Sequence, residues 1–257
     1  MIFITGDVHS KTMGGFEQEK IGSEILASER YLQILKKHKI SCTLFINGKC
    51  LEDEREDFQR LLKYDVEFGG HTYDNFGSMG IIKSYMFRKI FGCIYGPKFI
   101  QRRDIIKTKK AFEKRGLNMN SWRTHAFGSN NKTFELLSKL GVKVVSDLLG
   151  EIRPFNKDSI IHTPINIPVD QNTIAYGKLL PENRNPFASC TKGRINAQEW
   201  FEILKKRVSK NEKKKIPSVI LIHPATMATL DKFKMFEEIC EFLSKYKSKK
   251  ISGLTLR

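Results

Sequence analysis

The sequence lacks the features that mark several classes of protein. None of its five cysteines stands in a CxxC pair, which argues against both a thiolate metal site and a disulfide framework. No apolar run approaches the roughly 18 residues that cross a bilayer. The N-terminal residues lead directly into a strand, without a basic segment or a cleavage site. We therefore expect a cytoplasmic protein with no membrane span.

Acidic residues are also scarce, with 28 Asp and Glu against 45 Lys and Arg, so the net charge is +17. The basic excess is dispersed, with clusters at residues 205–207, 210–215 and 245–250. Neither a nucleic-acid reader motif nor interleaved aromatic residues accompany these clusters. We therefore interpret them as a solvated, lysine-rich surface and expect no nucleic-acid partner. Such a surface would attract an anionic substrate, for example a phosphate-linked sugar.

The hydrophobic pattern predicts an α/β fold. Short apolar strands are expected at residues 2–5, 42–46, 66–68, 121–123, 142–145, 219–222 and 251–256. Apolar residues at helical spacing predict helices at residues 23–38, 54–64, 99–114, 132–140, 197–208 and 234–246. This alternation indicates a parallel sheet or barrel, in a single domain that spans residues 1–257. Residues 76–96, rich in glycine and aromatic side chains, are expected to form an irregular insertion.

Polar residues suited to catalysis or metal binding follow five of the predicted strands. They are Asp7 and His9, then His71, Asp74 and Asn75, then Arg123 and His125, then Asp147, and finally His223. A single His or Asp at a strand end is often only structural. The carboxyl ends of the strands in a parallel barrel, however, share the face on which active sites are built. Five such ends together therefore predict one site.

Several of these segments resemble motifs of the polysaccharide deacetylase superfamily (NodB-like, carbohydrate esterase family four). Asp7-Val8-His9 is similar to the family's aspartate pair, His71-Thr72 resembles the start of its histidine motif, and Leu221-Ile222-His223 resembles its Leu-x-His motif. Arg123 matches one residue of a further motif, and Asp147 matches one residue of another. The motifs follow the family's order, but none is intact, so the chain resembles a divergent member with altered metal-binding motifs.

The resemblance implies a distorted (β/α) barrel of seven or eight parallel strands. It also implies a hydrolase that uses a divalent metal, most often zinc, to remove acetyl groups from N- or O-acetylated sugars. The expected partner is thus an acetylated sugar or sugar phosphate, in surface-polysaccharide or nucleotide-sugar metabolism. The oligomeric state is not implied.

The resemblance also implies a role for each matching residue. Asp7 would be the general base, and Arg123 would orient it through a bidentate contact. His223 would be the general acid, with Asp147 holding its imidazole in one tautomer. These four residues form the predicted catalytic set.

The metal ligands are less completely matched. His9 and His71 supply two imidazoles, which suit zinc and similar metals. The third ligand could be Asp74, Asn75 or His125, since Asn75 stands where the family usually has a histidine. Two other functions stay open at this point. The chain could be a different carbon–nitrogen hydrolase on the same barrel, or a degenerate carbohydrate-binding homologue without activity.

Overall fold

The computed structural model describes residues 1–11, 16–76, 80–177, 187 and 193–256. These residues form an eight-stranded sheet in the order β6-β7-β5-β4-β3-β2-β1-β8. The strands are β1 (Ile2–Val8), β2 (Cys42–Ile46), β3 (Val66–Gly70), β4 (Ser121–Trp122), β5 (Val144–Val145), β6 (Phe155–Lys157), β7 (Ile160–His162) and β8 (Ser218–Leu221). Neighbours pair in parallel, except that β6 and β7 form an antiparallel hairpin at one edge. Seven parallel strands confirm the predicted fold class.

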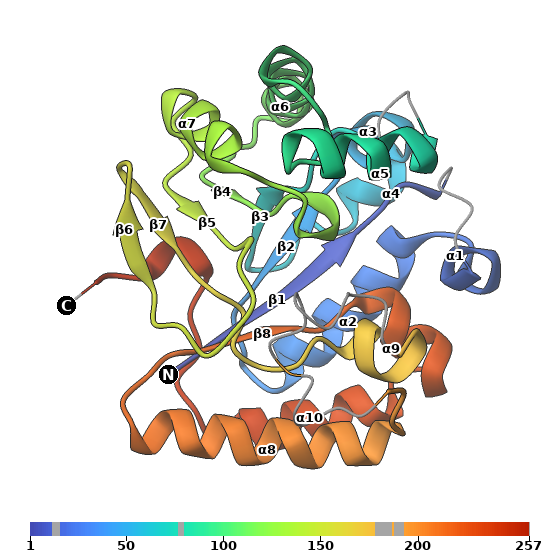
Figure 1. Ribbon diagram of the computed structural model, residues 1–257. Coiled ribbons are helices and arrows are strands. Elements are labelled where there is room, and N and C mark those ends of the chain that lie inside the picture. Colours follow the sequence, from blue (N-terminus) through green and yellow to red (C-terminus); the bar gives the residue numbers. More distant parts are fainter. Residues whose placement is uncertain (12–15, 77–79, 178–186, 188–192, 257) are drawn as a thin grey trace.

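Helices follow most strands and cover the outside of the sheet (Figure 1). The α-helices are α1 (Phe16–Ile21), α2 (Glu24–Lys37), α3 (Gly48–Asp53), α4 (Arg55–Gln59), α5 (Gly80–Phe91), α6 (Lys98–Glu113), α7 (Asn131–Lys139), α8 (Ala197–Lys213), α9 (Pro224–Asp231) and α10 (Lys234–Leu243). Shorter turns are the 3-10 helices η3 (His125–Phe127) and η6 (Ile251–Gly253) and the π-helical turn η4 (Gln171–Ala175). The long helix α8 packs beside α10 along one side of the molecule (Figure 1).

Two hydrophobic cores lie on opposite faces of the sheet, because successive side chains of a strand point to opposite sides. In β1, Ile2, Ile4 and Val8 pack in the large core beneath the helices. Phe3, between them, packs with Phe45 of β2 in a smaller core inside the curl of the sheet. This alternation decides which polar residues at the strand ends turn into the barrel.

The sheet curls until its far edges approach each other. The backbone N–H of Asn166, beyond β7, donates to the carbonyl oxygen of Val219 in β8 at 3.2 Å. In return, Asn166 Oδ1 accepts from the Val219 N–H at 3.0 Å. The result is the predicted distorted barrel, closed at this point by one residue rather than by a strand pair.

The structure differs from the sequence-based expectation in several segments: the helix expected at residues 54–64 ends at Gln59, and helices α1, α3 and α9 were not expected. Residues 80–91 of the expected irregular insertion form the helix α5, and residues 251–253 of the expected last strand form the turn η6. No glycine or proline interrupts residues 81–91, so a helix is permitted there despite the glycines on either side. Residues 77–79 lie outside the described residues. Among the helices described, none is both long and apolar enough to cross a membrane.

Candidate active site

The inner side of the barrel collects most of the predicted site residues at the carboxyl ends of the strands. Asp7 and His9 continue the side of β1 on which Phe3 faces inward. The residues that meet there are Asp7, His9, His71, Arg123, His125 and His223. All are buried except His125, which is half-buried. The prediction that distant strand ends converge on one site is therefore supported for these six residues.

Arg123 forms a buried ion pair with the Asp7 carboxylate. Arg123 Nη1 lies 2.7 Å from Asp7 Oδ1. The other guanidinium N–H groups donate to the backbone oxygen of Ser146 at 2.9 Å, to Ser146 Oγ at 2.8 Å and to Thr5 Oγ1 at 2.9 Å. The predicted bidentate contact is therefore wrong, because three other acceptors hold the guanidinium. Asp7 Oδ2 lies 3.8 Å from the Nε2 atoms of both His71 and His223.

The electrostatic surroundings keep Asp7 ionised. Burial alone would raise the pKa of Asp7, but the Arg123 guanidinium and the nearby imidazoles hold it well below its ordinary value. The carboxylate is therefore charged near neutral pH. It can accept a hydrogen bond or a proton at Oδ2, on the side that faces the histidines.

Three imidazoles form a cluster beside Asp7. Ligand nitrogens of His9, His71 and His125 all lie within 4.8 Å of one another. His71 Nδ1 lies 2.8 Å from the carbonyl oxygen of Arg123, and His9 Nδ1 lies 3.0 Å from Glu24 Oε2. Because both Nδ1 atoms face acceptors, the Nε2 atoms carry the lone pairs when the two rings are neutral. These two Nε2 atoms are 3.2 Å apart, so their lone pairs converge.

The structure selects among the three candidates for the third ligand. His125 lies in the cluster, and its Nδ1 is buried without a hydrogen-bond partner among the described residues. Asp74 lies elsewhere: its Oδ1 accepts from the Asn75 backbone N–H at 2.8 Å, and its Oδ2 is 3.6 Å from Lys49 Nζ. The prediction that Asp74 binds the metal is therefore wrong. Asn75 Oδ1 is buried and also has no partner in this part of the chain, so its role as a ligand stays a prediction.

The cluster has the chemistry of a metal site. Burial lowers the pKa of His71 to about 3, and burial and the neighbouring imidazoles also lower the pKa of His125. Neutral imidazole is the form that binds a metal ion. Burial would lower the pKa of His9 as well, but the Glu24 carboxylate raises it above its ordinary value. Two converging lone pairs and one buried nitrogen without a partner thus fit a divalent metal.

Glu24 is a further candidate residue of the site, and the sequence analysis did not identify it. It is the first residue of α2, and its Oε2 also accepts from the His9 backbone N–H at 2.8 Å. Carboxylates behind ligand histidines fix the orientation of the ring and raise its basicity. Glu24 begins a helix and follows no strand, so the strand-end rule could not find it.

His223 pairs with Asp170, which the sequence interpretation also missed. Asp170 Oδ1 lies 2.7 Å from His223 Nδ1, and Asp170 Oδ2 accepts from the His223 backbone N–H at 2.8 Å. Burial would lower the pKa of His223, but Asp170 and then Asp7 raise it to about 9. His223 is therefore protonated near neutral pH, as a general acid must be.

Asp147 does not hold His223, so that prediction is wrong. Its carboxylate accepts from the backbone N–H and the hydroxyl of Thr124, and burial raises its pKa to about 7. The reason is the alternation along β5. Val145 packs in the outer core, so Asp147, two residues later, also turns outward. Ser146 turns inward instead and contacts Arg123.

Comparisons with known proteins point to one family. Residues 26–145 match the family described as polysaccharide deacetylase. A comparison with curated proteins gives no significant match. Among solved structures, a protein from Mycobacterium smegmatis that is assigned as a polysaccharide deacetylase has a TM-score of 0.74 and 15% sequence identity. The likeness covers 98% of this chain and 87% of that one.

Two other solved structures show how widely this fold is used. The Puue allantoinase has a TM-score of 0.64 and 12% identity, over 97% of this chain and 86% of its own. A CE4-family pseudoenzyme from Bacillus anthracis has a TM-score of 0.55 and 14% identity, over 98% and 64%. Identities this low show only a shared fold. Residues 26–145 therefore match the polysaccharide deacetylase family, whose members are hydrolases that act on carbon–nitrogen bonds other than peptide bonds, and the chain has the NodB-like barrel fold.

Proposed function

We propose that this protein is a metal-dependent hydrolase that removes an acetyl group from an N- or O-acetylated sugar, in surface-polysaccharide or nucleotide-sugar metabolism. The observation that carries the proposal is the convergence of three histidine nitrogens beside Asp7 and His223. Asp7 Oδ2 is 3.8 Å from both His71 Nε2 and His223 Nε2. A base, an acid and a set of metal ligands therefore surround one small volume.

Asp7 and His223 would carry out the two proton transfers of amide hydrolysis. Asp7 accepts a proton from the attacking water, and Arg123 keeps its carboxylate in position. His223 then donates the proton at Nε2 to the leaving amine. Asp170 accepts from the opposite nitrogen of the ring and stabilises the imidazolium.

His9, His71 and His125 would hold the metal, which we propose to be zinc because histidine nitrogens are among its preferred ligands. The ion would polarise the acetyl carbonyl and lower the pKa of a water molecule. Glu24 and the Arg123 carbonyl fix the His9 and His71 rings, so that both Nε2 atoms face the same point. This arrangement reduces the reorganisation that metal binding requires.

Two alternatives are compatible with the same fold. The likeness to an allantoinase favours a hydrolase that acts on a non-sugar amide. The likeness to a CE4 pseudoenzyme is compatible with a non-catalytic carbohydrate-binding protein. The Asp7–Arg123 and His223–Asp170 pairs favour an active enzyme, because both charged pairs are buried and aimed at the histidine cluster.

Acetate release from a panel of N- and O-acetylated sugars tests the proposal, with zinc-loaded protein and non-sugar amides in parallel. We expect release from at least one sugar, and a loss of about 100-fold or more in the His223→Gln variant. Asp74→Asn is the matched control and should retain full activity, since Asp74 lies outside the cluster. Release from amides alone supports the first alternative. A folded, metal-bound protein that hydrolyses nothing supports the second.

A further inference from the structure

Helix α5 presents its hydrophobic residues to solvent. Ile82 is 75% exposed and Ile90 is 66% exposed, and Ile81, Tyr85 and Met86 are each at least half exposed. The only buried residue of the helix is Ser84. A helix on the surface of a soluble protein normally turns its apolar stripe toward the core. In α5 this arrangement is reversed.

The exposed residues form one continuous stripe. Ile82, Met86 and Ile90 are spaced at i, i+4 and i+8, which places them on one face of a helix. Lys89 and Tyr85 lie on the same face by the same spacing. Contiguous apolar surface of this kind marks an interaction site.

The chain segment that carries the stripe is basic and contains no acidic residue of its own, although Lys98 pairs with Glu135 of α7. Residues 75–103 include no Asp or Glu. Their cations are Lys83, Arg88, Lys89, Lys98, Arg102 and Arg103. A helix with Ile, Met and Tyr on one face and lysines beside them has the composition of a helix that lies in a bilayer interface. The basic residues complement an anionic surface.

The segments on both sides of α5 contact the active site. Ser84 Oγ donates to the Phe76 carbonyl oxygen at 3.1 Å, and the Phe76 ring lies 5.0 Å from the His125 ring. After the helix, the Tyr95 hydroxyl donates to the carbonyl oxygens of Asp74 and Asn75, at 2.7 Å each. The stripe therefore belongs to the part of the chain that borders the histidine cluster. Figure 1 shows α5 on the side of the molecule toward which β1 points.

We propose that α5 docks the protein on the surface of an anionic lipid bilayer, with Ile82, Met86 and Ile90 inserted between the headgroups. A second copy of this chain is a less suitable occupant, because each copy carries a net charge of +17. Docking through α5 brings the histidine cluster near the headgroups. The substrate is then an amide-bearing headgroup of an anchored amphiphile, a conclusion that rests on the proposed function.

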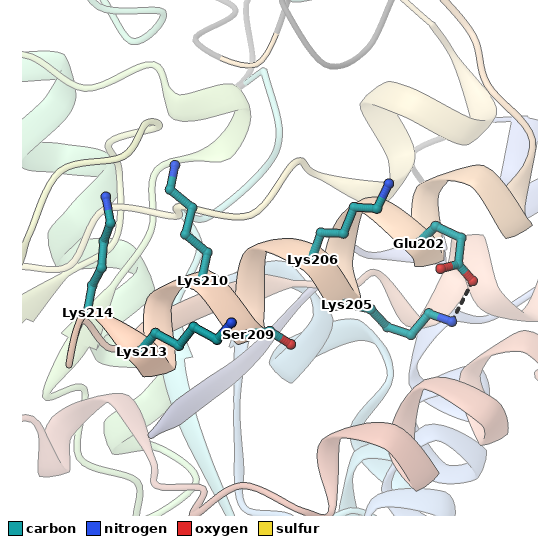
Figure 2. Close-up of a pocket in the computed structure, with 7 residues that line it drawn as sticks. All are labelled: Glu202, Lys205, Lys206, Ser209, Lys210, Lys213 and Lys214. Atoms are coloured by element: carbon teal, nitrogen blue, oxygen red, sulfur yellow. Dashed lines mark ion pairs between the residues drawn. The ribbon is translucent and has the colours of Figure 1, made fainter.

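A second basic surface provides the internal control. Figure 2 shows lysines along the outer side of α8, around a shallow depression of about 580 Å³. The residues that line it are Glu202, Lys205, Lys206, Ser209, Lys210, Lys213 and Lys214. None of them is apolar, so α8 offers charge without side chains that insert. The two surfaces can therefore be distinguished by substitution.

Sedimentation with vesicles tests docking without a catalytic readout. Vesicles of phosphatidylcholine alone are compared with vesicles of phosphatidylcholine and phosphatidylglycerol in equal parts. We expect tighter binding to the mixed vesicles, weakened by salt. The double variant Ile82→Glu with Ile90→Glu should lower partitioning at least about tenfold, since it removes two inserted side chains and adds negative charge. The control Ile152→Glu, at an exposed apolar residue outside α5, should bind as the parent does.

Three results would overturn the proposal. The first is a parent protein that does not bind the mixed vesicles. The second is binding that survives the Ile82 and Ile90 substitutions but is lost in Lys206→Glu with Lys213→Glu, which would place docking on α8. The third is a dimer that forms without vesicles and that the α5 variant disperses. Since no hydrolysis is measured, failure of the proposed activity leaves this test intact.

Discussion

Replacing Asp170 by asparagine removes the negative charge behind His223 and keeps the size of the side chain. In the parent protein, Asp170 Oδ1 lies 2.7 Å from His223 Nδ1 and Oδ2 accepts from the backbone N–H at 2.8 Å. Burial opposes the imidazolium, but Asp170 and Asp7 raise the His223 pKa from 6.5 to about 9. Without the Asp170 charge, burial dominates and the pKa of His223 should fall by about two pH units or more.

The raised pKa of His223 also makes the free energy of unfolding depend on pH. A difference between 6.5 and about 9 corresponds to ~3 kcal/mol. Because the folded pKa is raised, this contribution is fully present below pH 6.5 and is lost as the pH rises through about 9. In Asp170→Asn most of this pH dependence should disappear. The amide can also accept from only one of the two His223 donors, which costs about 1–3 kcal/mol for the other.

Two measurements check the reasoning. The pH profile of kcat/KM should fall above about pH 9 in the parent, and at least about two units lower in Asp170→Asn. Urea unfolding at pH 6.5 and pH 9 should show the loss of stability in the parent and little change in the variant. Asp147→Asn is the matched control, since Asp147 binds Thr124 instead. An alkaline limb that stays in place in Asp170→Asn, or moves equally in Asp147→Asn, would refute the assigned pair.

Three further variants test other parts of the structure. Asp7→Asn should lower kcat/KM by about 10²–10⁴-fold, and should destabilise the fold by about 3 kcal/mol because Arg123 loses its buried counter-charge; acetate release and urea unfolding measure the two effects. Glu24→Gln should weaken metal binding by about 10–100-fold, measured by competition with a chelator; equal affinity would remove Glu24 as a support for His9. Gly70→Ala should lower the free energy of unfolding by about 1–3 kcal/mol, because the added Cβ would lie 2.5 Å from the Trp122 ring. Gly253→Ala is the control, since the nearest atom to its Cβ would be 3.9 Å away. A similarly large loss of stability in Gly253→Ala would contradict this reasoning.

Much of the fold could be predicted because each strand carries its own local signal. The apolar runs at residues 2–5 and 42–46 form adjacent parallel strands, as their helical neighbours in the sequence indicated. The insertion was misjudged because glycine and aromatic content predicts irregular structure only on average. Residues 81–91 contain neither glycine nor proline, and the helix that forms there faces solvent. Its apolar residues do not pack against the core, so a helix with one buried face was not expected there.

The site could be predicted only where a strand aimed the side chain. Asp7 lies near the end of β1, and His71 and His223 follow β3 and β8. The alternation of these strands turns all three side chains inward. Asp147 also follows a strand, but with the opposite parity, so position after a strand was not sufficient. Asp170 precedes a helical turn and reaches His223 from a part of the chain without a regular period. The pairing of Asp170 with His223 depends on tertiary packing between distant segments, and no local sequence pattern indicates it.

The most direct test of the central claim is a crystal structure, or an X-ray absorption spectrum, of the zinc-loaded protein. We expect one ion per chain, with nitrogen ligands from His9, His71 and His125 at roughly 2.0–2.1 Å. The His125→Ala variant should lose one of these ligands. A protein that binds no zinc under these conditions would contradict the account, as would an ion held by Asp74 and away from Asp7.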